Sequence, residues 1–278
     1  MSKVWLITGA SRGLGRAFTE AALKSGHRVV ATARNIEHLV DVASKFGESV
    51  RTVSLDVTNE AQAKSAVQVA IKTFGGLNVL VNNAGYGNVC PVEDTSLADF
   101  RAQIETNLFG VIIMTKAVLP YFRQRASGHI IQISSIGGRV GPTGRAAYAA
   151  AKFGVEGFSE SLSKEVGPLG IKVTIVEPGG FRTDFAGSST EFREGRPEYD
   201  MTVGATVRFQ RNYDGKQPGD PVKAAAALIH IASLSEPPLR LLLGSDAYKA
   251  AEEHALQILA SDGEWKDLSI STDYRLPD

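Results

Sequence analysis

The chain has 278 residues, 43% hydrophobic and 22% charged, with a formal net charge of zero; this is typical of a soluble globular protein and gives no overall basic charge for binding nucleic acid. Cys90 is the only cysteine, so an internal disulfide and a cysteine-based metal cluster are excluded, and we expect no metal site. No basic-then-apolar leader opens the chain and no apolar run approaches about 18 residues, so we expect a cytoplasmic protein without membrane insertion.

A glycine-rich turn follows the first predicted strand, residues 4–8, and leads into a predicted helix at 16–25. Gly9, Gly13 and Gly15 let the backbone turn tightly and approach a pyrophosphate, and the helix amino terminus offers unpaired N–H groups to it. The turn therefore predicts a dinucleotide site, the alternative being an ordinary strand-to-helix turn. The residues of the turn that we expect to contact the cofactor are Gly9, Ser11, Arg12, Gly13, Leu14 and Gly15.

The second predicted strand, residues 28–32, is followed by Arg34, and no acid occurs before Glu37. An acid at this point would accept hydrogen bonds from the ribose hydroxyls of NAD, whereas a guanidinium binds the 2′-phosphate of NADP. Arg34, together with Arg12 in the glycine turn, therefore predicts NADP(H) in preference to NAD(H). The alternative is two solvated arginines.

Two further strand ends carry candidate site residues. Asp56 and Val57 follow the third predicted strand, residues 52–55, and Asp56 is equally well explained as a cofactor contact or as a turn or cap residue. The fourth predicted strand, residues 79–81, leads into the run Asn82-Asn83-Ala84-Gly85. A buried asparagine can hold several backbone groups, and small residues leave room for a cofactor. We expect Asn83, Ala84 and Gly85 to line the site.

Tyr148 and Lys152 are four residues apart on a predicted helix at 148–166, which places them on one face. A free tyrosine has a pKa of about 10, and a charge about 5 Å away at an effective dielectric near 20 is worth about 3 kcal/mol, or roughly 2 pKa units. The lysine could therefore lower the tyrosine pKa towards neutrality. Ser135 follows a buried apolar strand at 129–133, where ligand sites of open α/β sheets gather. The alternative is a surface helix with an incidental Y-x-x-x-K.

These motifs together resemble the short-chain dehydrogenase/reductase family over residues 3 to about 245. The T-G-x-x-x-G-x-G turn, the N-N-A-G run, Ser135, the Y-x-x-x-K pair and the P-G-x-x-x-T run from Pro178 to Thr183 come in the order and spacing of that family. The resemblance implies a single doubly wound α/β domain over 1–278. Its seven-stranded parallel sheet would have the order 3-2-1-4-5-6-7, with helices on both faces.

The resemblance also implies roles for individual residues. Tyr148 would exchange a proton with the substrate oxygen, Ser135 would fix that oxygen, and Lys152 would bond the nicotinamide ribose and lower the Tyr148 pKa. Asn107 would break its helix and hold a water that links Lys152 to solvent. Other cofactor contacts would come from Asp56 beside the adenine, and from Pro178, Gly179 and Thr183 beside the nicotinamide. The implied activity is hydride transfer between NADP(H) and a ketone or secondary alcohol.

The carboxyl-terminal third is less regular. Residues 184–218 are polar and dotted with glycine, proline and aromatic residues, which is typical of a substrate-covering lid. Its aromatics indicate either an apolar or aromatic substrate or packing of the lid on its own domain. A helical tail spans about 246–278, and we expect Trp265 and Leu268 to anchor its end. Cys90 is either part of the pocket or an inert small residue.

Small residues on the 148–166 helix, among them Gly154 and Gly157, favour a homodimer or homotetramer or, alternatively, close packing within the subunit. Two other functions stay open. One is an NADP-binding sensor without turnover, which typically lacks the tyrosine or lysine. The other is a lyase or epimerase of the related extended fold, against which the short tail argues.

Overall fold

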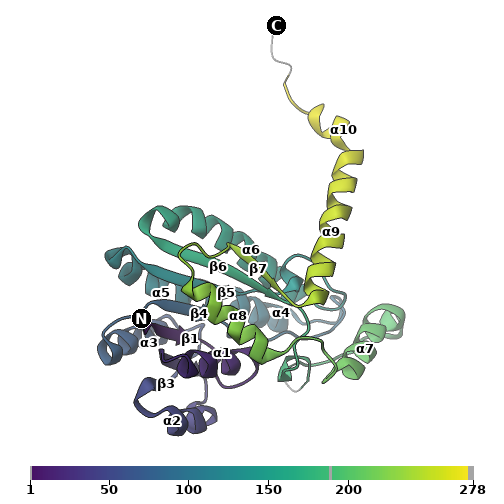
Figure 1. Ribbon diagram of the computed structural model, residues 1–278. Helices are drawn as coiled ribbons and strands as arrows, with labels where there is room; N and C mark the ends of the chain where they lie inside the picture. Colours follow the sequence, from purple (N-terminus) through teal and green to yellow (C-terminus); the bar gives the residue numbers. More distant parts are fainter. Residues whose placement is uncertain (1, 188–189, 275–278) are drawn as a thin grey trace.

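The computed structural model describes residues 2–187 and 190–274 and has a parallel sheet with helices on both faces (Figure 1). The strands have the order β3-β2-β1-β4-β5-β6-β7, which confirms the predicted fold class and topology. The strand bounds are β1 (Val4–Ile7), β2 (Arg28–Ala33), β3 (Val50–Ser54), β4 (Val79–Asn82), β5 (Gly128–Ile133), β6 (Ile171–Pro178) and β7 (Arg240–Leu243).

The helices connect these strands as right-handed crossovers require. Their bounds are α1 (Gly13–Lys24), α2 (Val40–Phe46), α3 (Glu60–Phe74), α4 (Leu97–Ile104), α5 (Gly110–Arg125), α6 (Ala146–Val166), α7 (Ala205–Tyr213), α8 (Pro221–Ser233), α9 (Ser245–Glu264) and α10 (Lys266–Ile270). Three starts follow from the sequence, because Asn59, Ser96 and Asp220 each accept a hydrogen bond from a first-turn N–H.

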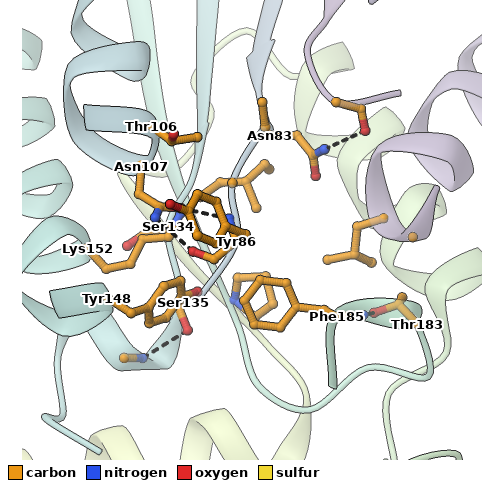
Figure 2. A pocket seen from close by; sticks show the side chains of 18 of the residues that line it. Asn83, Tyr86, Thr106, Asn107, Ser134, Ser135, Tyr148, Lys152, Thr183 and Phe185 are labelled. Carbon is orange, nitrogen blue, oxygen red and sulfur yellow. Dashed lines mark hydrogen bonds between the residues drawn. The ribbon is translucent and has the colours of Figure 1, made fainter. Parts of the chain in front are cut away.

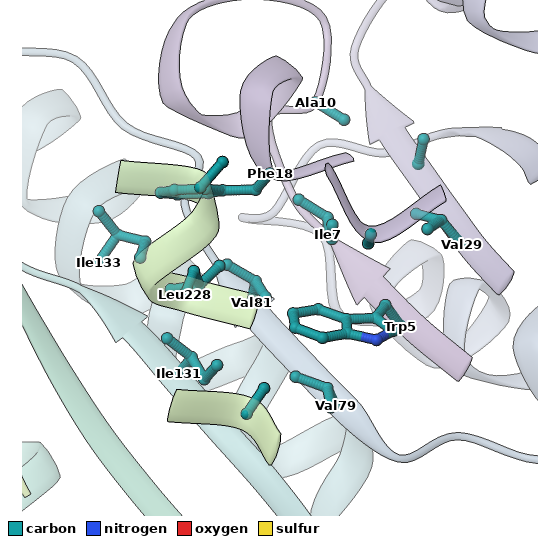
Figure 3. Close-up of a cluster of buried hydrophobic side chains, with 14 of the residues drawn as sticks. Trp5, Ile7, Ala10, Phe18, Val29, Val79, Val81, Ile131, Ile133 and Leu228 are labelled. Carbon is teal, nitrogen blue, oxygen red and sulfur yellow. The ribbon is translucent and has the colours of Figure 1, made fainter. Parts of the chain in front are cut away.

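Alternating side chains of the strands build one hydrophobic core on each face of the sheet. Trp5 and Ile7 point to the face covered by α1 and α8, where they pack with Phe18 and Leu228 (Figure 3). Leu6 and Leu80 point to the other face, in a cluster with residues of α3, α5 and α6. Both layers consist of buried hydrophobic side chains, and together they fix the relative positions of the strand ends.

The described part of the lid segment, residues 184–187 and 190–218, has more regular structure than its composition predicts. It contains α7, preceded by a single π-helical turn at Asp200–Gly204. Phe192 and Tyr199 pack against a small cluster of Val89, Val203 and Val207, and Phe192 forms a β-bridge with Val89. The expectation of an irregular segment is therefore wrong over these residues, because Val89 supplies an apolar partner from a distant part of the chain.

The carboxyl-terminal helices α9 and α10 project away from the sheet (Figure 1). Ala247 and Ala251, in the first two turns of α9, are buried, whereas every residue from Gln257 onward in the described part is exposed. Trp265 and Leu268 are 61% and 62% exposed, so the expectation that they anchor the end of the chain is wrong within this protomer.

The helical stretch Leu97–Arg125 is long and apolar enough to cross a bilayer by length and composition alone. In this fold its carboxyl-terminal half is α5, and Met114, Val118 and Phe122 are buried against the sheet. A core helix of this kind passes the same test as a membrane span.

The two cores predict that replacing a buried leucine lowers the free energy of unfolding much more than replacing an exposed one. Leu80→Ala should lower the free energy of unfolding by about 2–5 kcal/mol, because Leu80 is fully buried on a central strand and leaves a cavity. Leu97→Ala is the matched control, since Leu97 is 69% exposed, and should change it by less than about 0.5 kcal/mol. Urea unfolding followed by circular dichroism measures both, and equal losses would contradict the assigned core.

Candidate active site

A cavity of about 670 Å³ lies at the carboxyl ends of the strands, where the crossover loops leave the sheet. Every residue predicted to belong to the site lines this cavity except Gly15. These residues are Gly9, Ser11, Arg12, Gly13, Leu14, Arg34, Asp56, Val57, Asn83, Ala84, Gly85, Asn107, Ser135, Tyr148, Lys152, Pro178, Gly179 and Thr183.

The glycine turn has the geometry that only glycine accommodates. Gly9 and Gly13 have φ values of +64° and +58°. A Cβ on Gly15 would lie 2.2 Å from the carbonyl oxygen of Gly9 and 2.3 Å from Nδ2 of Asn83. Gly15 therefore supports the turn from behind, which explains why it does not line the cavity.

Asn83 holds this turn in place. Its side-chain amide donates to the carbonyl oxygens of Thr8 and Gly9, at 2.9 and 3.1 Å, and its backbone N–H donates to Oγ1 of Thr8 at 2.9 Å. The expected structural role of Asn83 is thus visible as hydrogen bonds that join the ends of β1 and β4.

One end of the cavity is suited to the phosphates of a dinucleotide. Helix α1 begins at Gly13, so its unpaired amino-terminal N–H groups lie in the turn that lines the cavity. Arg12 and Arg34 are exposed, line the cavity, and form no ion pair within the described residues. This end of the cavity therefore fits a phosphorylated dinucleotide, because it combines the glycine turn, the amino terminus of a helix and two basic side chains.

Asp56 is a turn residue, and its contact with a cofactor stays a prediction. Thr58 donates to its carboxylate through N (3.0 Å) and Oγ1 (2.7 Å), which makes a turn. These hydrogen bonds, and then the charge of Arg34, lower the pKa of Asp56. The residue also lines the cavity beside Arg34.

Ser135, Tyr148 and Lys152 lie together on one side of the cavity, and Thr183 and Phe185 lie across from them (Figure 2). Ser135 follows β5 and its Oγ accepts a hydrogen bond from the N–H of Gly137 at 3.0 Å. Tyr148 and Lys152 come from the first two turns of α6, and Nζ of Lys152 lies 5.6 Å from the centre of the Tyr148 ring. The arrangement brings a hydroxyl, a phenol and an amine to one point.

The pKa of Tyr148 differs from the expected direction. Burial raises the pKa of Tyr148 above its usual value of 10.0, and a hydrogen bond with Ser135 and the charge of Arg145 oppose this rise. The prediction that Lys152 brings the pKa of Tyr148 towards neutrality is therefore wrong for this structure. The physical reason is that desolvation of the phenolate exceeds the favourable charge interactions.

Lys152 is itself desolvated. Burial lowers its pKa to about 8, and the nearby Glu156 carboxylate only partly compensates. Nζ donates to the carbonyl oxygen of Ile133 at 2.8 Å. An ammonium has three donors, so further donors remain for a ligand or a water. The lowered pKa brings the titration of Lys152 closer to neutral pH than that of a solvated lysine.

Asn107 lies in a π-helical turn, Glu105–Phe109, which interrupts the helix between α4 and α5 as expected. Its Oδ1 accepts from the N–H of Tyr86, and its Nδ2 donates to the carbonyl oxygens of Tyr86 and Gln103, both at 2.8 Å. The side chain therefore positions the loop that carries Tyr86. The expected relay through a water stays a prediction.

Many other residues line the cavity that the sequence analysis did not assign to the site, among them the polar or charged Tyr86, Arg145 and Asp246. Asp246, at the start of α9, accepts a hydrogen bond from the N–H of Gly180 at 2.7 Å and so holds the loop after β6. No local pattern marks it, because its partner is more than sixty residues away. Cys90 is buried and does not line the cavity, which favours its inert interpretation.

The model of the short chain dehydrogenase family matches residues 3–194. Oxidoreductase BOA17 of Botryotinia fuckeliana is 48% identical over 98% of this chain and 100% of its own length. A crystal structure of a short-chain dehydrogenase from Streptomyces avermitilis is 41% identical with a TM-score of 0.92, covering 99% of this chain and 100% of that one. Serine dehydrogenase complexed with NADP+ is 29% identical with a TM-score of 0.75, covering 86% and 94%.

The buried amine of Lys152 predicts a pH-dependent contribution to stability. Between its pKa of about 8 in the fold and 10.5 in the unfolded chain, the unfolded state binds more protons, so the free energy of unfolding rises with pH. Lys152→Met should remove this rise, which amounts to at most about 3 kcal/mol. Chemical denaturation at pH 7 and at pH 10 measures it.

Lys164→Met is the control, because Lys164 lies on the same helix with 73% of its side chain exposed. In this control, the free energy of unfolding should change between pH 7 and pH 10 by the same amount as in the unsubstituted chain. An identical pH dependence for Lys152→Met would contradict the burial of a titrating amine.

Proposed function

The chain belongs to the short-chain dehydrogenase family, and from this premise we propose that it is an NADP(H)-dependent oxidoreductase that interconverts a ketone and a secondary alcohol. The observation that carries the proposal is the convergence of Ser135, Tyr148 and Lys152 on the same cavity as the glycine turn and its two arginines. NADPH, when bound, would supply the hydride. The residues that would hold it are those of the glycine turn, Arg12, Arg34 and Lys152.

The side chains of the chain itself provide the proton and the orientation. Tyr148 would donate its phenolic proton to the carbonyl oxygen during reduction and remove it during oxidation. Ser135, which lines the cavity beside Tyr148, would donate to the same oxygen and fix its position. Lys152 would return the proton to Tyr148, since its pKa of about 8 lets it both give and take protons near neutral pH. We propose reduction as the physiological direction.

Assembly into a homodimer or homotetramer is also proposed. Phe109, the last residue of the π-helical turn before α5, and Phe153 of α6 are each 46% exposed, and α9 presents an exposed apolar side. Gly154 does not support assembly, because a Cβ there would lie 2.8 Å from Leu108 of the same protomer. Gly157 has open space at its Cβ position and is available to another subunit.

Removing the proton donor should abolish turnover and spare cofactor binding. Tyr148→Phe should reduce kcat by about 100- to 10,000-fold, the usual contribution of general acid catalysis. Its Kd for NADPH, measured by fluorescence titration, should change little. Tyr121→Phe is the control, because Tyr121 lies on α5 outside the cavity. NADPH binding by the unsubstituted chain without turnover of any ketone would favour the sensor alternative.

The cofactor preference should depend on the two arginines. Arg12→Ala and Arg34→Ala should each raise the Kd for NADPH by about 10-fold, as loss of a charge-assisted hydrogen bond predicts, and leave NADH binding nearly unchanged. Arg51→Ala, an exposed arginine of β3, is the control. Paired titrations with NADPH and NADH measure this, and tighter binding of NADH by the unsubstituted chain would overturn the proposed preference.

A further inference from the structure

Arg145 is a buried cation beside the proposed proton donor. It is the residue immediately before α6, three positions ahead of Tyr148, and it lines the cavity with only 8% of its surface exposed. Its guanidinium carbon lies over the rings of Tyr148 and Phe185, at 5.9 and 5.8 Å from their centres. The charge is therefore fixed within a few ångströms of the place where the substrate carbonyl would react.

The guanidinium of Arg145 has few partners. Within residues 2–187 and 190–274 its side chain makes one hydrogen bond, from Nη1 to the carbonyl oxygen of Gly87 at 3.2 Å, and no ion pair. A guanidinium carries five N–H donors. Most of its N–H donors therefore have no hydrogen-bond partner among the described residues, and the residue lines the cavity.

Two partly exposed arginines near the site, Arg139 and Arg240, are paired with carboxylates, and their side chains are 32% and 31% exposed. Arg139 forms two hydrogen bonds with the buried Glu177 carboxylate, at 2.8 and 2.7 Å. Arg240 contacts Glu156 at 3.2 Å and Glu160 at 2.8 Å. Burial of an uncompensated charge costs several kcal/mol, which these carboxylates offset for Arg139 and Arg240 but not for Arg145. Arg145 is the exception in this set.

The backbone adds to the positive potential. Arg145 occupies the amino-terminal cap of the 21-residue helix α6, where the helix dipole also favours an anion. Burial lowers the pKa of Arg145, which shows how far the guanidinium is removed from water. A negatively charged group placed here would regain the lost solvation energy.

We propose that Arg145 binds a carboxylate of the substrate, so that the substrate class is an oxo acid and its hydroxy acid. The inference rests on the proposed reductase function and makes it more specific. A guanidinium matches the planar carboxylate in a two-pronged contact. The remainder of the substrate would contact Tyr86, Ile136 and Phe185, which line the same region, so an apolar or aromatic body joins the carboxylate to the ketone.

The test compares each acid with its own methyl ester. We would measure kcat/KM with NADPH for 2-oxo-2-phenylacetate, 4-oxo-4-phenylbutanoate and 5-oxo-5-phenylpentanoate, for their methyl esters, and for neutral aromatic ketones. The unsubstituted chain should prefer at least one acid over its ester by about 10-fold or more, an effect of the size expected for one charged hydrogen-bonded pair. The preferred length reports the distance between Arg145 and the reacting carbonyl.

Two variants assign that preference to Arg145. Arg145→Met should lower the acid-to-ester ratio by about 10- to 100-fold, mainly through KM, and Arg145→Lys should restore part of it. Using the ratio removes any effect that the lost charge has on Tyr148 itself. Arg123→Met, an exposed arginine of α5, is the control and should leave the ratio unchanged.

The outcomes separate this inference from the proposed function. Turnover of esters and neutral ketones without preference for any acid would overturn the carboxylate site and leave the reductase proposal standing. An equal fall in kcat/KM for acids and for esters in Arg145→Met would also overturn the carboxylate site and leave the reductase proposal standing. Absence of turnover for every compound, despite NADPH binding, would overturn both.

Discussion

The contact between the glycine turn after β1 and Asn83 after β4 is the constraint on which the site depends. The amide of Asn83 reaches two carbonyl oxygens of the turn, and Gly15 lies so close behind that any side chain there would overlap backbone and amide alike. Neighbouring parallel strands are thereby joined at their carboxyl ends as well as by their ladder. The same hydrogen bonds that close the turn keep its positive-φ glycines facing the cavity. The conformation of the glycine turn therefore depends on the pairing of β1 with β4 in the sheet.

The chemistry of the cavity arises from burial more than from pairing. Tyr148, Lys152 and Arg145 are all nearly inaccessible to water, and desolvation has the largest effect on the pKa of each. Behind them, Glu177 and Glu156 are tied to Arg139 and Arg240, and burial raises the pKa of Glu177 to about 7. Carboxylates are therefore used to hold α6 and β6 together, while the cavity side keeps groups that gain from a bound ligand. The two hydrophobic cores contribute stability that offsets the free-energy cost of burying these charged groups.

The described part of the lid segment, residues 184–218, and helix α9 lie outside the two cores of the sheet. Within residues 184–218, Phe192 and Tyr199 complete a small cluster with Val89, whereas Phe185 and Tyr213 line the cavity. Packing of the lid on its own domain therefore explains Phe192 and Tyr199, whereas the substrate interpretation stays a prediction for Phe185 and Tyr213. Helix α9 contributes Asp246 to the site through its first turn and then leaves the body of the protein, so one element joins the cavity to an exposed apolar surface.

Local patterns in the sequence determined the strand-turn-helix units and marked the cavity residues on the glycine turn, at the strand ends and on the Tyr148 helix, and the family resemblance that they carry implied the fold class and strand order. Strand-turn-helix units are short-range, each glycine or cap residue acts on its own neighbours, and parallel strands bring their carboxyl ends to one edge whatever lies between. The spacing of Tyr148 and Lys152 on one helix belongs to the same class of information. Asn59, Ser96 and Asp220 likewise mark helix starts that the structure confirms.

Tertiary structure alone decided the electrostatics and the long-range contacts. The direction of the Tyr148 pKa depends on how completely α6 is covered, and Asp246 reaches its partner across more than sixty residues of chain. Trp265 and Leu268 have the composition of an anchor, yet α9 points them away from the sheet. Arg145 lies three positions before Tyr148 in the sequence. Only its burial without a carboxylate partner, which the tertiary structure decides, distinguishes it from the solvated arginines. Desolvation is a property of the surroundings of a group, and those surroundings come from parts of the chain that no local pattern connects.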